Sequence, residues 1–376
     1  MSPKSRGRPK GRGRKGKSRR PPAQDPLALL LGEASSLVQQ DDALLAEAWA
    51  SRWLGYAWSA ALGDEDVDPL DGELDLVDAV VERVLRHPSS AGLAALHALA
   101  RVAPAEGTDL VAEAIDELPA TLPAPAFATA PRAEPGRAWT AVDVWGAERL
   151  VFVEYDTPVV HTLVAQVLDV AGRYVETLAL AVGPDVVPEW AGHRTDDDVP
   201  MEPVETPVDV ALADLADALA GTEVNSETFP DAEDYQDLRA LAWSRAVEHA
   251  AEAAPPRPAL SEEDRERLGA AFLASGAVPD DETSAALVRL FLDFGEAYLP
   301  DGPLSWSPVA VIAFLGDALP GRVALEPAEE RALPEVLRAW LRFALAERGV
   351  PEPWVQPVLD AVDEGMRPEA GEGSPS

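Results

Sequence analysis

Histidines and carboxylates are the residues of this chain that could act as general acids, general bases or metal ligands. The five histidines lie at positions 87, 97, 161, 193 and 249, without the short spacing of metal ligands. The sequence contains no HExxH metal motif, no GxSxG nucleophile motif and no cysteine. Its 66 acidic residues are so numerous that abundance alone identifies no acid or base. The sequence therefore assigns no catalytic residue, no metal ligand and no cofactor.

Three polar residues near a predicted β-sheet mark the region where such chemistry is best sought: His161, Glu154 and Asp169. A histidine beside a carboxylate can transfer protons. The alternation of the sequence does not place the three on one face, so they define a region and not a site. An enzyme with a carboxylate and histidine site between sheet and helices is accordingly one alternative function.

Two acidic stretches have part of a metal-binding pattern. Residues 64–75 carry aspartate at the first, third and fifth positions of an EF-hand loop, but Pro69 replaces the required glycine and Asp75 replaces the bidentate glutamate. His193 precedes three aspartates at 196–198, yet all four are neighbours in one polar segment. Both stretches predict solvated acidic loops.

The N-terminal residues 1–22 form the most unusual segment. Residues 1–20 hold 10 of the 31 Lys and Arg and no acid, and their Gly, Pro, Lys and Arg cannot bury enough surface to fold alone. Residues 11–18 match the P-loop spacing GxxxxGK[ST], and the glycines at 11, 13 and 16 match GxGxxG. Neither match has the preceding strand and following helix that phosphate binding requires. We therefore predict a disordered basic tail without a nucleotide site.

The run Arg6, Gly7, Arg8, Pro9 and Lys10 resembles the AT-hook core of DNA-binding proteins. The resemblance implies an extended segment in a narrow A·T minor groove, with Arg6 and Arg8 reaching inward. A narrow groove concentrates negative potential, which attracts arginine. The neighbouring residues expected to touch phosphates are Arg12, Arg14 and Lys15. The alternatives are a tail that touches RNA without sequence preference, an inert tail, and a tail docked on the acidic body.

Charge separates the tail from the rest of the chain. The formal net charge is −35 although the tail is strongly basic, so the body is intensely acidic. An acidic body repels nucleic acid, and any contact with a polyanion is expected through the tail. The absence of cysteine fits a reducing cytoplasm. We expect no secretory signal and no membrane-spanning segment, since no apolar run is long enough.

The body is predicted to be an α+β protein that is predominantly α-helical. Residues 137–253 contain a four-strand antiparallel β-meander in 138–182, with a hairpin turn at Ala171-Gly172, and a loop over 183–207. In the N-terminal region, Leu45, Trp49, Trp53 and Tyr56 recur at helical spacing and predict one buried face. The predicted domains are a helical domain at 23–118, an Ala/Pro linker at 119–136, the α+β domain at 137–253, a Pro-rich linker at 254–258, a C-terminal helical domain at 259–366 and a disordered tail at 367–376.

The body resembles uncharacterised proteins of high-GC bacteria in its meander, VFVEYDTPVVHTLVAQVLDVAG, and in the late helices LSWSPVAVIAFLGDALP and LPEVLRAWLRFAL. No activity is attached to that family, so the resemblance supports the fold and adds nothing on function. The sequence favours a non-enzymatic protein that contacts nucleic acid through its tail, while the body binds an unidentified protein partner or the tail itself. An acidic adaptor without nucleic-acid contact is a further alternative.

Overall fold

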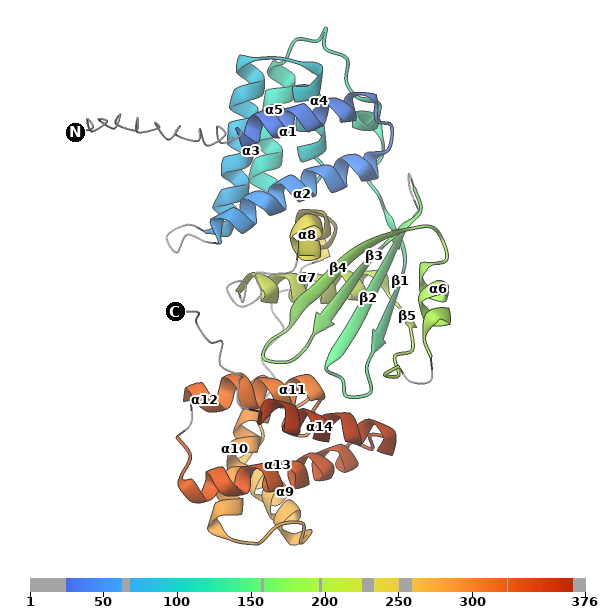
Figure 1. Cartoon of the computed structure of the whole chain (residues 1–376). Helices are drawn as coiled ribbons and strands as arrows, with labels where there is room; N and C mark the ends of the chain where they lie inside the picture. The colour runs from blue at the N-terminus through green and yellow to red at the C-terminus, as the bar shows by residue number, and fades with distance from the viewer. Residues whose placement is uncertain are drawn as a thin grey trace, which may run out of the picture.

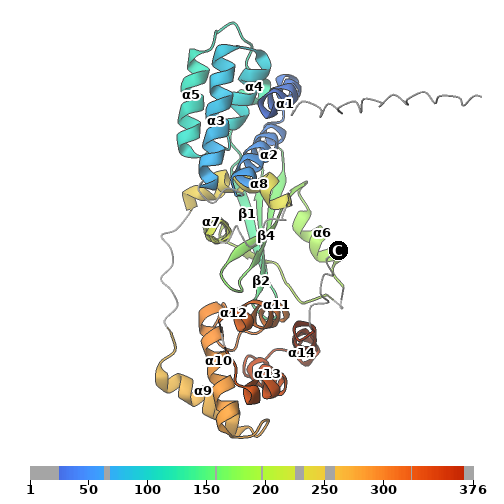
Figure 2. The same ribbon diagram turned by 60° about the vertical axis from the view of Figure 1, so that its left-hand side comes forward.

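The computed structural model describes residues 25–62, 68–156, 159–195, 198–224, 233–249, 259–322 and 324–367. The predicted basic tail and all its candidate nucleic-acid contacts lie outside these ranges. The chain is mostly helical with one small antiparallel sheet, which confirms the predicted α+β, predominantly helical class. N-terminal helices occupy one end of the molecule, the sheet the middle and C-terminal helices the other end (Figures 1 and 2).

The N-terminal helices begin where the sequence supplies side-chain caps. The carboxylates of Asp42 and Asp68 accept hydrogen bonds of 2.9 Å from the backbone amides two residues later. Pro69 is the first residue of its helix, where a missing N–H costs nothing. The second half of the predicted acidic loop is therefore helical. The helices are α1 (Pro26–Glu33), α2 (Ala43–Ala61), α3 (Pro69–Arg86), α4 (Ser90–Leu99) and α5 (Ala105–Glu117), with 3-10 turns at Ala34–Gln39 and Ala126–Thr129.

Helix α2 is buried on two sides, and the predicted single face is wrong at two of its four positions. Trp49 and Trp53 are each 8% exposed, whereas Leu45 is 53% and Tyr56 59% exposed. A second helix crosses α2 at Gly55, where an added Cβ would lie 1.9 Å from the backbone oxygen of Gln236. Because this crossing covers another side of α2, its buried surface does not follow one stripe.

Five strands form one antiparallel sheet in the order β4-β3-β2-β1-β5. The four predicted strands are present as a meander, and Ala171 and Gly172 in the last hairpin both have positive φ, as tight hairpin turns require. A fifth strand, β5, corrects the predicted count. The strands are β1 (Pro135–Val142), β2 (Glu148–Tyr155), β3 (His161–Leu168), β4 (Tyr174–Val182) and β5 (Val204–Thr206).

The segment predicted as a loop over 183–207 contains β5 and the short helix α6 (Val186–His193). Prolines suggested a loop, but Pro203 and Pro207 only flank a three-residue strand at the sheet edge. Edge positions tolerate proline because one side of the strand needs no ladder hydrogen bonds. Phe127, in the predicted Ala/Pro linker, is fully buried against the N-terminal helices.

Helices cover both faces of the sheet. Helices α7 (Val208–Val224) and α8 (Glu233–Ala246) pack with Val151, Val153 and Tyr155 on one face. Helix α6 packs with Leu150 and Phe152 on the other face. Helix α8 also contacts α2, so it lies between the sheet and the N-terminal helices (Figure 1).

The C-terminal helices enclose an aromatic core of their own. Phe291, Trp306 and Trp340 are fully buried at its centre. The elements are α9 (Glu262–Ala274), α10 (Glu282–Tyr298), α11 (Pro308–Ala313), a π-helical turn (Phe314–Ala318), α12 (Leu319–Arg322), α13 (Pro327–Glu347) and α14 (Val355–Gly365). Within the described residues, no helix combines the length and apolar character needed to cross a membrane.

The hairpin turns of the sheet dock on these C-terminal helices. Trp145, in the β1–β2 turn, is 5% exposed and its indole N–H donates to the Trp354 oxygen at 3.1 Å. Arg348 donates to the Trp145 oxygen at 2.7 Å. The Ala171 amide donates to the Tyr298 oxygen at 2.9 Å. We call these contacts the hairpin junction.

Candidate functional site

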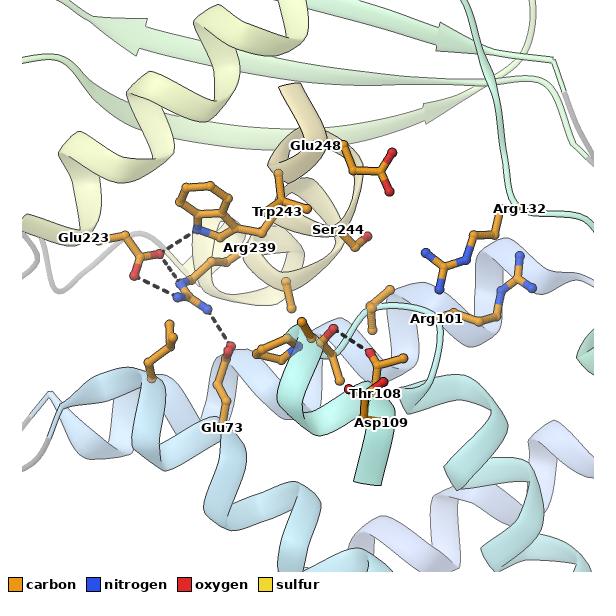
Figure 3. A pocket seen from close by; sticks show the side chains of 17 residues that line it. Glu73, Arg101, Thr108, Asp109, Arg132, Glu223, Arg239, Trp243, Ser244 and Glu248 are labelled. Atoms are coloured by element: carbon orange, nitrogen blue, oxygen red, sulfur yellow. Dashed lines mark hydrogen bonds and ion pairs between the residues drawn. The ribbon is translucent and has the colours of Figure 1, made fainter. Parts of the chain in front are cut away.

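A cavity of about 480 Å³ opens where α3, the start of α5 and α8 meet (Figure 3). This volume lies in the range of small-molecule sites. Its apolar lining is Leu70, Val102, Ala103, Pro104, Ala105, Ala240, Trp243 and Val247. Its polar lining is Glu73, Arg101, Thr108, Asp109, Arg132, Glu223, Arg239, Ser244 and Glu248. The walls are thus apolar with charged groups at fixed places.

One guanidinium is shared by two carboxylates at one side of the cavity. Arg239 Nη1 donates to Glu73 at 2.5 Å, while Nε and Nη2 donate to the two oxygens of Glu223 at 2.7 and 2.8 Å. The Trp243 indole donates to Glu223 at 2.8 Å, and the Arg239 guanidinium lies 4.9 Å above the Trp58 ring. Since α3, α7 and α8 each contribute a charged residue, this cluster joins three helices.

Burial changes the acidity of Glu73. The side chain is only 2% exposed, and desolvation, which exceeds the stabilising effect of Arg239, raises its pKa to about 7. The nearby Glu223 carboxylate raises the pKa further. A carboxyl group of this kind is a candidate proton carrier. Although Glu73 lines the cavity, its side chain is almost completely buried and accepts a hydrogen bond from Arg239, and we assign it a structural role.

A second buried charge cluster adjoins the cavity. Glu47 of α2 accepts from Arg101 at 2.7 Å and from Arg245 of α8 at 2.6 Å. Arg101 also donates to the backbone oxygens of residues 130 and 131 at 3.1 and 3.0 Å. Each of its three nitrogens therefore already donates one hydrogen bond within the protein. We call this cluster and the Arg239 cluster together the α8 junction.

His161 belongs to the same junction. Arg245 can only donate, so at 3.1 Å the His161 Nε2 must accept, and Nδ1 carries the proton that is donated to the Val159 oxygen at 2.7 Å. Burial lowers the pKa of His161, and the Arg245 cation lowers it further. Tyr155 stacks on the imidazole with ring centroids 5.1 Å apart. The histidine is thus neutral, oriented and occupied at both nitrogens.

The two hydroxyl groups in the cavity lining are not activated for nucleophilic attack. Ser244 donates to the Leu241 oxygen at 2.7 Å, and Thr108 donates to the Ala103 oxygen at 3.0 Å. No described histidine or carboxylate is hydrogen-bonded to either hydroxyl. A nucleophile needs an adjacent base. Neither hydroxyl therefore has, among the described residues, the base that would activate it.

The three residues predicted near the sheet do not converge. His161 starts β3 and faces α8, whereas Glu154 is directed to the opposite face by strand alternation and accepts from Arg137 at 2.9 Å. Asp169 follows the far end of β3 and accepts from Arg173 at 2.6 Å. Each residue has its own cation, so the structure offers no site that combines them.

The predicted acidic stretches also contain no metal site within the described residues. Asp68 caps α3, and His193 Nδ1, in the last turn of α6, donates to the Glu189 backbone oxygen at 2.6 Å. Asp198 accepts from the Thr195 amide. No group of three or more potential ligands is close enough to hold an ion in the ranges that the structure describes. Positions 63–67 and 196–197 lie outside those ranges.

The residues of the cavity were not singled out by the sequence. Glu73 was seen only as part of an acidic loop, and Arg239 only as part of the predicted α+β domain at 137–253. One signal was present: Glu73 lies four residues from Val77 and seven from Val80, on the apolar face of its helix, where an unpaired carboxylate would be costly. That position predicts a buried cationic partner but does not identify it.

Comparison with models of protein families, with curated proteins and with solved structures finds no match for this chain.

Proposed function

We propose that the body of this chain binds a small organic molecule in the cavity between α3, α5 and α8. The observation that carries the proposal is a cavity of about 480 Å³ with apolar walls and charged groups held in place by buried ion pairs. Preformed pockets of this size, with few convergent polar groups, are the usual form of small-molecule sites. The occupied hydroxyls Ser244 and Thr108 favour binding over catalysis.

A neutral, apolar fluorescent dye such as Nile red tests this proposal. We expect saturable binding of one dye per chain, and loss of that binding in Ser244→Phe, since the phenyl ring would fill the cavity from α8. Ser36→Phe, at an exposed position of the 3-10 turn after α1, is the matched control and should bind dye like the wild type. Absence of saturable binding, or equal binding by Ser244→Phe, would contradict the proposal.

The opposite charges of tail and body favour a second function. We propose that residues 1–22 attach the protein to nucleic acid while the acidic body remains free to meet a protein partner. The basis is the sequence: a tail with ten cationic residues in its first twenty positions, a net charge of −35 for the chain, and the AT-hook-like Arg6, Gly7, Arg8, Pro9 and Lys10. The cytoplasm is the compartment that the lack of cysteine favours.

Electrophoretic shift with A·T-rich and G·C-rich duplexes tests the tail. Deleting residues 2–20 should abolish binding, and wild-type affinity should fall steeply with salt because counterions are released from the phosphates. The charge-conserving variant Arg6→Lys/Arg8→Lys should keep the general affinity but lose any preference for A·T duplexes, since lysine fits a narrow groove less well. Unchanged binding after the deletion would refute the attachment.

A further inference from the structure

The carboxylates at the Arg239 side of the cavity are not fully neutralised. Glu73 and Glu223 share the single Arg239 guanidinium, and each of its three nitrogens already donates to one of them. Two negative charges against one positive charge leave an excess of about one negative charge when both carboxylates are ionised. Glu248 and Asp109 add two further carboxylates elsewhere in the lining, apart from the Arg239 cluster (Figure 3). The excess negative charge of Glu73 and Glu223 could therefore be neutralised by one more cation at this side of the cavity.

Glu223 is the carboxylate that a bound molecule can reach. Its side chain is 22% exposed, compared with 2% for Glu73. Its Oε1 accepts from Arg239 and Trp243, whereas Oε2 accepts one hydrogen bond, from Arg239. A carboxylate oxygen has two lone pairs, so Oε2 can accept from one more donor. Among the described residues, Oε2 of Glu223 therefore keeps one acceptor position free.

The surroundings of Glu223 suit an organic cation better than a hydrated metal ion. The Trp243 indole lines the cavity beside the carboxylate, and aromatic rings attract ammonium and guanidinium groups. Val102, Ala240 and Val247 supply apolar contact for the rest of a ligand. Among the described residues, no group of three or more potential metal ligands is close enough here to hold an ion.

The two guanidiniums at the other side of the cavity would bind an anionic ligand only weakly. Figure 3 shows Arg101 and Arg132 away from the Arg239 cluster. Arg101 is occupied by Glu47 and two backbone oxygens. Arg132 is exposed and donates to the Ala100 oxygen at 3.4 Å. An exposed guanidinium holds an anion with little net free energy, because water and salt screen it.

We infer that the cavity takes a small organic cation, an ammonium or amidinium group carried on an apolar chain or ring, with the charged group at Glu223 and Trp243. This inference rests on the proposed function and adds the chemical class of the ligand. The strong negative charge of the whole chain, −35, would also raise the local concentration of such cations.

Three probes of matched length separate the charge of the ligand from its apolar part: octylammonium, octan-1-ol and octanoate, measured by calorimetry at pH 8 below their aggregation limits. We expect octylammonium to bind one site about tenfold tighter than octanol, in line with one charge-assisted hydrogen bond, and octanoate to bind weakest. Equal affinities, or octanoate binding tightest, would overturn the inference while leaving the proposed function standing. If no probe binds and the dye does not bind either, both fail.

Two variants connect the result to this site. Glu223→Gln should reduce octylammonium affinity about tenfold and leave octanol affinity unchanged, since only the charged contact is lost. Glu335→Gln, at an exposed position of α13, removes one negative charge elsewhere and should change neither. Ser244→Phe should abolish both. An equal loss in Glu335→Gln would mean attraction by net charge alone and would contradict a site at Glu223.

Discussion

The sheet is joined to the helices at its two ends by contacts of different kinds. At the α8 junction the contacts are buried ion pairs, in which Arg239 serves two carboxylates and Glu47 accepts from two arginines. At the hairpin junction the contacts are an indole packed on a second indole, with ring centroids 6.1 Å apart, and hydrogen bonds to backbone oxygens. The stability of the α8 junction therefore depends on how many of its carboxylates are protonated, whereas that of the hairpin junction does not.

This difference determines how strongly substitutions at each junction should change the stability of the protein. Buried charges gain little net free energy from pairing because desolvation offsets attraction, but removal of one partner leaves an unpaired charge at high cost. An apolar junction loses free energy in proportion to the surface that is removed. We therefore expect substitutions at the α8 junction to be more severe and more dependent on pH than those at the hairpin junction.

The largest effect is expected for Arg239→Met. The substitution keeps the volume but leaves Glu73 and Glu223 buried without their cation, which should reduce the free energy of unfolding by about 4 kcal/mol at pH 8. The loss should be smaller at pH 5, where Glu73 is protonated. Urea unfolding measures both values. Arg265→Met, whose pairs with Asp293 and Glu296 are partly exposed, is the control and should cost at most about 1 kcal/mol.

At the hairpin junction, Trp145→Ala should cost about 3 kcal/mol, since a nearly buried indole and its hydrogen bond to Trp354 are lost. The same loss is expected at pH 5 and pH 8. Trp145→Phe keeps most of the packing and should cost about 1 kcal/mol. A strong pH dependence of the Trp145→Ala effect would remove the contrast between the two junctions.

Glu73→Gln tests directly whether protonation of Glu73 stabilises the folded protein. Because the pKa of Glu73 is raised to about 7 in the folded state from 4.5, the folded protein binds the proton more tightly. The stabilisation is complete below pH 4.5 and is lost as pH rises through 7, up to about 3 kcal/mol. Glutamine mimics the neutral acid, so variant and wild type should be similar at pH 4.5. The variant should be the more stable at pH 8, and parallel stability curves would contradict the mechanism.

Gly55→Ala probes the helix crossing in the α8 junction. The new methyl group would lie 1.9 Å from the Gln236 backbone oxygen, so α2 and α8 must separate, at a cost of about 2 kcal/mol. Gly192→Ala, in α6, has no atom within 4 Å of the added Cβ and is the matched control. Thermal unfolding of the two variants gives the comparison. Equal midpoints of thermal unfolding for the two variants would show that α2 and α8 can separate at Gly55 without a loss of stability.

Local patterns predicted the elements well, and long-range pairing explains what they missed. Alternation in residues 139–144 and the β-branched and aliphatic residues up to 182 identified the four-strand meander. Strand β5 was missed because three residues between two prolines carry too little pattern. The exposure of Leu45 and Tyr56 was missed because the buried surface of α2 depends on where α8 crosses it, at Gly55 and Gln236, which are far apart in the sequence.

The residues that form the cavity could be predicted from the sequence even less than these elements. Glu73 and Arg239 are separated by 166 positions, and no local rule connects them. Abundant carboxylates made every acidic residue an equal candidate, whereas in the structure Glu73 is the most deeply buried acid of the described residues, and burial raises its pKa to about 7. His161 was named only as marking a region where proton transfer could be sought, and its neutral ring, hydrogen-bonded at both nitrogens, fits an orienting role in the α8 junction instead.

The acidity of Glu73 tests the central claim, that buried and incompletely neutralised charge holds the α8 junction and shapes its cavity. The side-chain carboxyl carbon of Glu73, labelled with carbon-13 and assigned by its loss in Glu73→Gln, can be followed by NMR from pH 4 to pH 9. The account predicts a midpoint at about 7. A midpoint near 4.5, the value for an ordinary glutamate, would show that the carboxylate is solvated or fully neutralised, and the account would be wrong.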